Sequence, residues 1–318
     1  MSCGRPRRWP ARRRTDMRPG HRPSTVSSRR RTVAVVGVLA CLVLAAPAAH
    51  AAEFDRTVPA TRGTRLDVRL FGGEVVVRAW DREAVRIRAT HFSTDTIDVK
   101  TEGQVMAVRA RSRGGRPHAI DFRIDVPAWM AVSLTGTYLD VRVEGTKAAV
   151  TAETVRGDVW VKGGEGELRL KSVEGEVALE GAKGRAELNA VNDIVRVTGF
   201  EGDLLVETVS GSVKIQGVNA RSAVVSTVSG DIAWDAPLAA SGRYELGTHD
   251  GDIDVTLPDA ASATIGVRAF EGHVRSTYPV KLPEGNAARK RFSFTLGGGA
   301  AALELETFTG TISIRKQG

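Results

Sequence analysis

The chain has 318 residues and a formal charge of +8 at pH 7, from 45 basic and 37 acidic side chains. Residues 1–51 hold 11 of the basic side chains and one of the acidic ones, so the remaining chain has a net charge of −2. The basic excess is therefore confined to residues 1–51, and a nearly neutral remainder of mixed charges argues against a nucleic-acid partner. Cys3 and Cys41 are the only cysteines, so beyond residue 51 there is no disulfide, thiol chemistry or cysteine-ligated metal.

Residues 1–51 have the composition of a basic leader that ends in a secretory signal peptide. Residues 29–31 are three arginines, residues 33–47 are apolar, and residues 49–51 (Ala-His-Ala) supply small side chains at the cleavage positions. The apolar run is shorter than the roughly 20 residues that span a bilayer comfortably. This pattern predicts export, with membrane contact only through the leader.

We therefore expect the signal peptide to be cleaved after Ala51, so that the mature chain starts at Ala52. The mature protein would then be periplasmic, on the cell surface or extracellular. Two alternatives stay open. Translation could begin at Met17 instead of Met1, and Cys41 lies in a segment that resembles a lipoprotein cleavage box, although the residues after it stay apolar.

Residues 52–125 alternate between apolar and polar side chains in short runs rich in Val and Ile, such as 65–70, 74–80 and 85–89. Alternation of period two is typical of β-strands. Longer polar links separate these runs. Because terminal repeats are atypical, we expect this region to be an irregular β cap on the repeat domain that follows.

An eight-residue phrase recurs from residue 154 to residue 314, for example at 227–234. Its fourth position falls at 157, 175, 193, 211, 230, 251, 272 and 310, in steps of 18 to 21 residues and a last gap of 38. A fixed period of this size indicates stacked supersecondary units. We predict a parallel β-solenoid of roughly nine coils over 126–318, with 279–299 as a loop that occupies one expected coil.

Each predicted coil contains two strands whose side chains alternate between a core and solvent. In the coil at 167–180 the expected core residues are Leu168, Leu170, Val177 and Leu179. Val195, Val213 and Ile232 follow the turn at one offset in successive coils. In-register stacking would place them in one inward column, because a one-residue slip would turn every core side chain outward.

Two further columns favour tight corners between the strands. The fourth position is glycine except at Asp193, so Asn192 and Asp193 are the best non-glycine candidates for a positive φ. The first position is always small and usually hydroxylated, which suits a corner where such side chains hydrogen-bond the backbone. Its residues are Thr154, Ser172, Ala190, Thr208, Thr227, Thr248, Ala269 and Thr307.

Two sets of polar residues could carry chemistry, and each has a structural explanation. His249 and Asp250 are the only suggestive histidine–acid neighbours, but His249 occupies a corner column held by valine in the preceding coils. Asp250, Asp252 and Asp254 alternate as in calcium-binding β-rolls. Ser212 and His273 interrupt the column to which Asp252 belongs, so we interpret the aspartates as a solvated acidic edge.

Stacked carboxylates are a third set, since glycoside hydrolysis requires two carboxylates in a groove. Asp158, Glu176, Asp231 and Asp252 share one face of the predicted solenoid. Adjacent coils lie only about 4.8 Å apart, so this proximity arises without any catalytic role. The aromatic residues Trp160 and Trp234 fit core or corner packing. We predict no catalytic, cofactor-binding or metal-binding residues.

Several phrases together resemble one bacterial family. They are Val126-Pro127, the repeated phrase at 227–232, the run at 255–258 and the closing phrase at 307–314. The family is a domain of unknown function described as a β-strand-repeat "putative adhesin" of exported and envelope proteins. The resemblance covers roughly residues 60–318 and implies a parallel β-solenoid with no established catalytic residues.

The sequence therefore favours an exported, non-enzymatic protein that is adhesin-like or a scaffold or binding module of the cell envelope. Its expected partners are cell-envelope polysaccharide or surface proteins, and no cofactor is expected. The alternative is a polysaccharide-active β-helix enzyme.

Overall fold

The computed structural model describes residues 51–115, 117–279 and 291–317. These residues form strands and turns, and none of them forms a helix that could cross a membrane. The strands in chain order are β1 (Ala51–Pro59), β2 (Arg65–Trp80), β3 (Ala84–Phe92), β4 (Asp95–Glu102), β5 (Val105–Ser112), β6 (Asp121–Pro127), β7 (Val132–Glu144), β8 (Val150–Arg156), β9 (Val159–Lys162), β10 (Glu165–Glu174), β11 (Val177–Glu180), β12 (Lys183–Asn189), β13 (Val195–Thr198), β14 (Glu201–Glu207), β15 (Val213–Gln216), β16 (Asn219–Ser229), β17 (Ile232–Asp235), β18 (Arg243–Asp250), β19 (Ile253–Leu257), β20 (Ala263–Ala269), β21 (His273–Ser276), β22 (Arg291–Leu296), β23 (Ala301–Thr309) and β24 (Thr311–Lys316).

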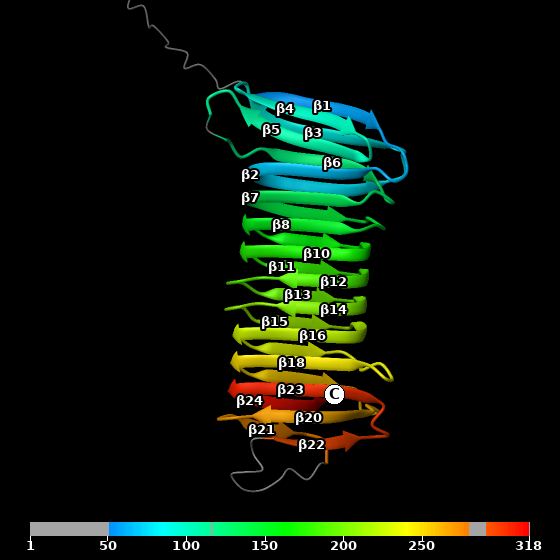
Figure 1. Ribbon diagram of the computed structural model, residues 1–318, viewed down its shortest axis with the longest axis vertical. Coiled ribbons are helices and arrows are strands. Elements are labelled where there is room, and N and C mark those ends of the chain that lie inside the picture. The colour runs from blue at the N-terminus through cyan, green and yellow to red at the C-terminus, as the bar shows by residue number, and fades with distance from the viewer. Residues whose placement is uncertain (1–50, 116, 280–290, 318) are drawn as a thin grey trace, which may run out of the picture. The chain divides into compact units, whose positions relative to one another are not determined.

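The repeat forms a parallel β-solenoid, as predicted (Figure 1). Each coil contributes one strand to each of two parallel stacks. In the middle of the solenoid β10 pairs with β8 and β12, while β11 pairs with β9 and β13. The pairing is in register, with Leu168 opposite Ala186 and Val177 opposite Val195.

The core lies between the two stacks and consists of the predicted inward columns. Leu168, Leu170, Val177 and Leu179 are at most 1% exposed, as are Val195, Val213 and Ile232. Their polar neighbours along each strand face solvent or are only partly buried. The period-two alternation therefore identified the core correctly, because alternate side chains of a strand point to opposite faces.

At its N-terminal end, the solenoid begins inside the region predicted to be a cap. Strand β2 pairs in parallel with β7, and β5 and β6 both pair in parallel with β2. Beyond them β4 is antiparallel to β5, β3 to β6, and β1 to β3. Residues 52–125 thus supply both regular coils and irregular antiparallel strands, and an independent domain boundary at residue 125 stays a prediction.

At its C-terminal end, the coils do not stack in chain order. Strands β23 and β24 pair with β18 and β19 on one side and with β20 and β21 on the other. The last coil in the sequence therefore lies between the two that precede it (Figure 1). The prediction that 279–299 is a loop that occupies one coil was wrong: its described part includes the whole of β22, which runs antiparallel to β20.

This order has a simple cause, since an antiparallel strand reverses the chain direction. After β22 the chain can return in parallel to the open side of β20, which is the side that faces β18. Residues 280–290, part of the predicted loop, lie outside the described residues.

Irregular steps of the repeat also have local causes. Gly202 pairs with Ala220 and Asp203 pairs with Ser222, so Arg221 is a bulge that accounts for one step of 19 residues.

Ser241, with a φ of 62°, is the one non-glycine residue of positive φ among the described residues. The prediction of a positive φ at Asn192 or Asp193 was therefore wrong.

Hydroxyl groups bond the backbone at the corners, as predicted. Ser172 Oγ donates to the carbonyl oxygen of Gly157 at 2.8 Å, and Thr227 Oγ1 donates to that of Gly211 at 3.1 Å. A Cβ atom at Gly211 would overlap the backbone of Asp193 in the neighbouring coil, although Gly211 has no positive φ. At this position the close approach of two coils, more than the backbone conformation, requires glycine.

Candidate ligand-binding groove

An exposed apolar column runs along one corner of the solenoid, at the second position of the repeated phrase. We call it the corner stripe. Most of its side chains are 40–52% exposed, while Val173 and Val191 are half-buried and Thr137 interrupts it. Its most exposed members are Phe71, Val155, Val209, Val228, Phe270 and Phe308. The apolar column is visible in the sequence, but whether its side chains point to solvent or to the core depends on the geometry of the turn.

Aromatic rings widen the corner stripe at the C-terminal end. His249 and Phe308 stack with ring centroids 4.8 Å apart and planes 17° apart. Phe308 and Phe270 stack at 5.6 Å and 29°. This order follows from the position of β23 between β18 and β20. In chain-order stacking His249 would have met Phe270 directly.

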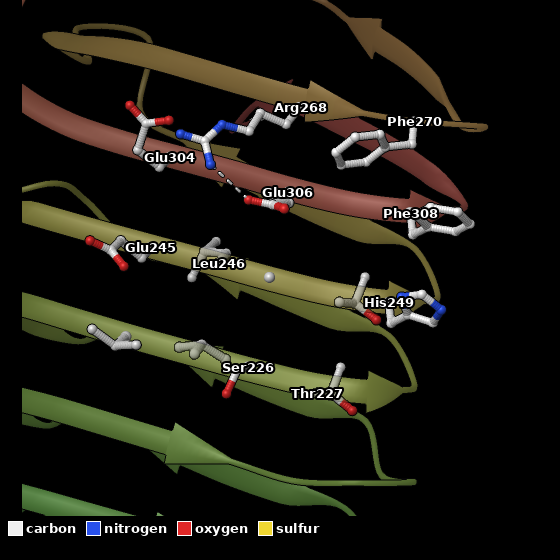
Figure 2. A pocket seen from close by; sticks show the side chains of 14 residues that line it. Ser226, Thr227, Glu245, Leu246, His249, Arg268, Phe270, Glu304, Glu306 and Phe308 are labelled. Atoms are coloured by element: carbon white, nitrogen blue, oxygen red, sulfur yellow. Dashed lines mark hydrogen bonds and ion pairs between the residues drawn. The ribbon is translucent and has the colours of Figure 1, made fainter. Parts of the chain in front are cut away.

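A groove of about 500 Å³ lies beside these rings, on the outer face of β16, β18, β23 and β20 (Figure 2). The rings form one wall. The side chains of Glu245 and Glu304 form the opposite wall, and Arg268 and Glu306 close the end over β20 and β23. The arrangement combines an apolar ledge with a few polar groups, which is the usual composition of a ligand site.

The groove is acidic. Arg268 Nη1 lies 3.1 Å from Glu306 Oε2, so these two charges compensate each other. Within the part of the chain that the structure describes, neither Glu245 nor Glu304 has an ion pair. The excess charge of the groove is therefore negative.

Gly247 forms the floor of the groove. It is not among the glycines of positive φ, and a Cβ atom there would meet nothing within 4 Å. Neither the backbone nor the packing of the solenoid therefore requires glycine at this position. Gly247 pairs in register with Ser226 on one side and with Glu306 on the other. Because it has no side chain, the space between these two residues stays unfilled.

The acidic column singled out from the sequence lies three residues after the corner stripe, in the turn that leads to the next strand, where the aspartates bond the backbone. Asp158 Oδ1 accepts from the N–H of Glu176 at 2.8 Å, and Asp231 Oδ1 accepts from that of Asp252 at 2.9 Å. Asp252 Oδ1 in turn accepts from the N–H of Thr311 at 2.7 Å. These hydrogen bonds give the column a structural explanation that the sequence alone did not show.

The other two aspartates proposed as an acidic edge each interact with a side chain of the last coil in the sequence. Asp250 Oδ1 accepts from the hydroxyl of Thr309 at 2.8 Å, and Asp254 pairs with Arg315 at 2.6 Å. Over the described residues, no three His, Cys, Asp or Glu side chains are grouped so that they could hold a metal ion.

The two tryptophans have structural roles. Trp234 is 1% exposed in the core, where its Nε1 donates to the carbonyl of Ala236 at 3.0 Å. Trp160 is half-buried on the outer face, with the guanidinium of Arg142 4.3 Å from its ring centroid. Trp234 agrees with the prediction of core or corner packing, whereas Trp160 lies on the outer face of β9.

A histidine–aspartate pair in the N-terminal antiparallel strands was missed. His118 Nδ1 lies 2.8 Å from the buried Oδ1 of Asp95, and Phe92 packs edge-on against the imidazole. Burial opposes ionisation of Asp95, but its hydrogen bonds, including that of His118, hold its pKa below the usual value. The two residues are 23 positions apart, and no spacing pattern in the sequence connects them.

The chain matches one protein family, and several solved structures are similar to it. A family model described as Toastrack DUF4097 matches residues 64–315. No curated protein matches the chain. Among solved structures, a "putative adhesin" from Parabacteroides merdae is 9% identical, with 82% of this chain and 95% of that one covered and a TM-score of 0.48.

Two other solved structures are similar at lower scores. A "putative lipid binding protein" from Parabacteroides distasonis is 12% identical, covering 84% of this chain and 97% of that one, with a TM-score of 0.38. A "putative cell adhesion protein" from Clostridium sporogenes is 10% identical, covering 84% and 100%, with a TM-score of 0.23.

Proposed function

The chain belongs to the Toastrack DUF4097 family, and on that premise we propose that it is an exported, non-enzymatic binding module of the cell envelope. In this proposal it acts as an adhesin-like protein or scaffold through the corner stripe and the adjoining groove. The observation that carries the proposal is the exposed apolar column itself. Contiguous exposed apolar side chains on a soluble protein mark interaction surfaces.

Export is supported by the signal-like leader, which lies outside the described residues. Strand β1 starts at Ala51 and pairs with β3 from that residue onward. Cleavage after Ala51 would therefore remove one residue of β1 and leave the remaining pairs intact. A mature start at Ala52 is compatible with the folded solenoid.

A binding role is also supported by the use that the solenoid makes of its carboxylates. Asp158, Asp231 and Asp252 accept hydrogen bonds from the backbone of the next coil. A general acid or nucleophile of a glycosidase must instead face its substrate in a groove. The polysaccharide-active enzyme is therefore the weaker alternative.

Retention on cell-envelope material tests the proposal. The mature protein is mixed with insoluble cell-wall polysaccharide and with acidic polysaccharide, and both retention and new reducing ends are measured. We expect retention on the cell-wall polysaccharide, weaker retention on the acidic polysaccharide because the groove is itself acidic, and no new reducing ends with either. The double variant Phe270→Ser, Phe308→Ser should lose this retention while keeping the circular dichroism spectrum of a β protein, because both rings are exposed. The control Lys214→Ser should be retained like the original protein.

Two results would contradict the proposal. New reducing ends that grow with time would establish the enzyme instead. Equal retention of the Phe270→Ser, Phe308→Ser variant would show that the corner stripe is not the binding surface.

A further inference from the structure

The groove differs from the rest of the outer face in how its charges are arranged. Elsewhere on this face, opposite charges meet across neighbouring coils. Lys183 Nζ lies 2.9 Å from Glu201, and Arg169 Nε lies 3.6 Å from Glu187. Such cross-strand pairs of opposite charge stabilise a sheet modestly.

At the groove, like charges meet instead. Glu245 on β18 and Glu304 on β23 are register partners, so their side chains leave the same face one strand apart. Like charges directly opposite each other destabilise a sheet. Glu304 extends over Gly266, whose missing side chain leaves room for the carboxylate. Among the described residues neither carboxylate has an ion pair, and the groove lining has three glutamates, Glu245, Glu304 and Glu306, against the one basic side chain of Arg268. A cationic ligand would complement this excess of negative charge.

The shape of the groove indicates what kind of cation fits. The carboxylates of Glu245 and Glu304 lie on the opposite side of the groove from the rings of His249 and Phe308 (Figure 2). Gly247 lies between Glu245 and His249 along β18. A ligand must therefore present a positive donor on one side and an apolar face on the other. A pyranose ring that carries an amino group does both, since its C–H face is apolar and its polar substituents project from the rim.

We propose that the groove binds the amino-sugar units of a cationic glycan, an inference that rests on the proposed envelope-binding function. The ammonium group donates hydrogen bonds to Glu245 and Glu304, and the sugar ring lies over Gly247 against Phe308. A rigid pyranose loses less conformational freedom on binding than a lysine side chain does, which favours a glycan over a basic peptide. The glycan extends along the corner stripe, whose coils repeat about every 4.8 Å.

Calorimetric titration of the mature protein with glucosamine oligomers tests this proposal. We expect binding that weakens as salt concentration rises, because exposed charges are screened. Glu245→Gln with Glu304→Gln should weaken binding by roughly tenfold or more. Gly247→Leu should weaken it similarly by filling the floor. The control Glu153→Gln, on the outer face of β8, should change it less than about twofold.

The melting temperature of each variant distinguishes a loss of binding from a loss of stability. Gly247→Leu should melt no lower than the original protein, because a Cβ atom there meets nothing within 4 Å and a side chain restricts the unfolded chain more than glycine does. Removing the like charges at Glu245 and Glu304 should also leave the melting temperature unchanged or raise it. Lost binding would then report the groove and not the fold.

Three results would overturn the assignment. They are equal binding of N-acetylated oligomers or of oligogalacturonate, equal binding of oligolysine with the same dependence on Glu245 and Glu304, or full binding by Gly247→Leu. If glucosamine oligomers do not bind while cell-wall material still retains the original protein, the ligand class is wrong and the envelope-binding function stands.

Discussion

Replacing Gly175 with alanine should strongly destabilise the solenoid, whereas the same change at Gly247 should not. Gly175 has a φ of 145°, and a Cβ atom there would lie 2.5 Å from the carbonyl carbon of Gly157 in the neighbouring coil. That contact is far inside van der Waals distance. The two coils must separate locally, and a side chain must also adopt a backbone conformation that favours glycine.

The cost can be worked out from the neighbouring contacts. The unusual backbone conformation costs about 1–3 kcal/mol. Two hydrogen bonds flank Gly175, from the N–H of Gly157 to Glu174 and from that of Val159 to Glu176, both at 2.8 Å. Weakening them costs about 1 kcal/mol each. We therefore expect a loss of about 3–5 kcal/mol, against a typical total of about 5–15 kcal/mol.

Urea titration followed by circular dichroism measures this loss. Gly247→Ala is the matched control, because its Cβ atom meets open space and alanine restricts the unfolded chain more than glycine does. That control should be neutral or stabilising by up to about 1 kcal/mol. If Gly175→Ala and Gly247→Ala shift the unfolding free energy equally, the close approach of the coils described here is wrong.

Three further predictions concern the core, the N-terminal strands and processing. Val213→Asp should cost several kcal/mol in a urea titration, because it buries a charge without a partner. Lys214→Asp should cost under about 1 kcal/mol, since it places an exposed carboxylate opposite Arg196; equal losses would contradict the register. Because the pKa of Asp95 is lowered from its usual value of 3.8, the ionised group stabilises the fold above about pH 4, and this contribution is lost as pH falls through the lowered pKa. The urea midpoint should therefore fall more between about pH 5 and pH 3 in the original protein than in Asp95→Asn, and parallel profiles would refute this. Intact-mass measurement of the exported protein should give Ala52 as the first residue, and a lipid-modified or uncleaved form would refute this.

The regular part of the solenoid was predictable because its pattern is local. Leu168 and Val177 alternate with polar neighbours and recur in every coil, so one register satisfies all of them. The order in which the coils stack is not encoded in this local pattern. The phrases that contain Phe270 and Phe308 fit equally well beside the coil of His249, and only the antiparallel strand β22 decides between them.

The candidate site was less predictable, because it depends on the stacking order of the coils and not on the local pattern within each coil. The groove requires Phe308 between His249 and Phe270, which the sequence order does not show. One signal was present: Gly247 stands at an outward position where other coils carry Lys171, Glu207 or Ser226. The pairing of distant residues such as His118 and Asp95 depends on a strand arrangement without a repeat, so no local pattern could reveal it.

The position of β23 between β18 and β20 is the claim on which the groove depends, and engineered disulfides test it most directly. No native cysteine follows Cys41. Glu245 and Glu304 are register partners in adjacent strands, about 4.8 Å apart, within the Cα range of a disulfide. Glu245 and Gly266 are separated by β23, so they lie near 10 Å and outside that range.

Both cysteine pairs are placed in the mature protein and oxidised mildly, and the intact mass is measured before and after alkylation. We predict that Glu245→Cys with Glu304→Cys forms an intramolecular disulfide, whereas Glu245→Cys with Gly266→Cys keeps two free thiols. The reverse result, with a disulfide only between the cysteines at 245 and 266, would mean that the coils stack in chain order. The groove described here would then not exist.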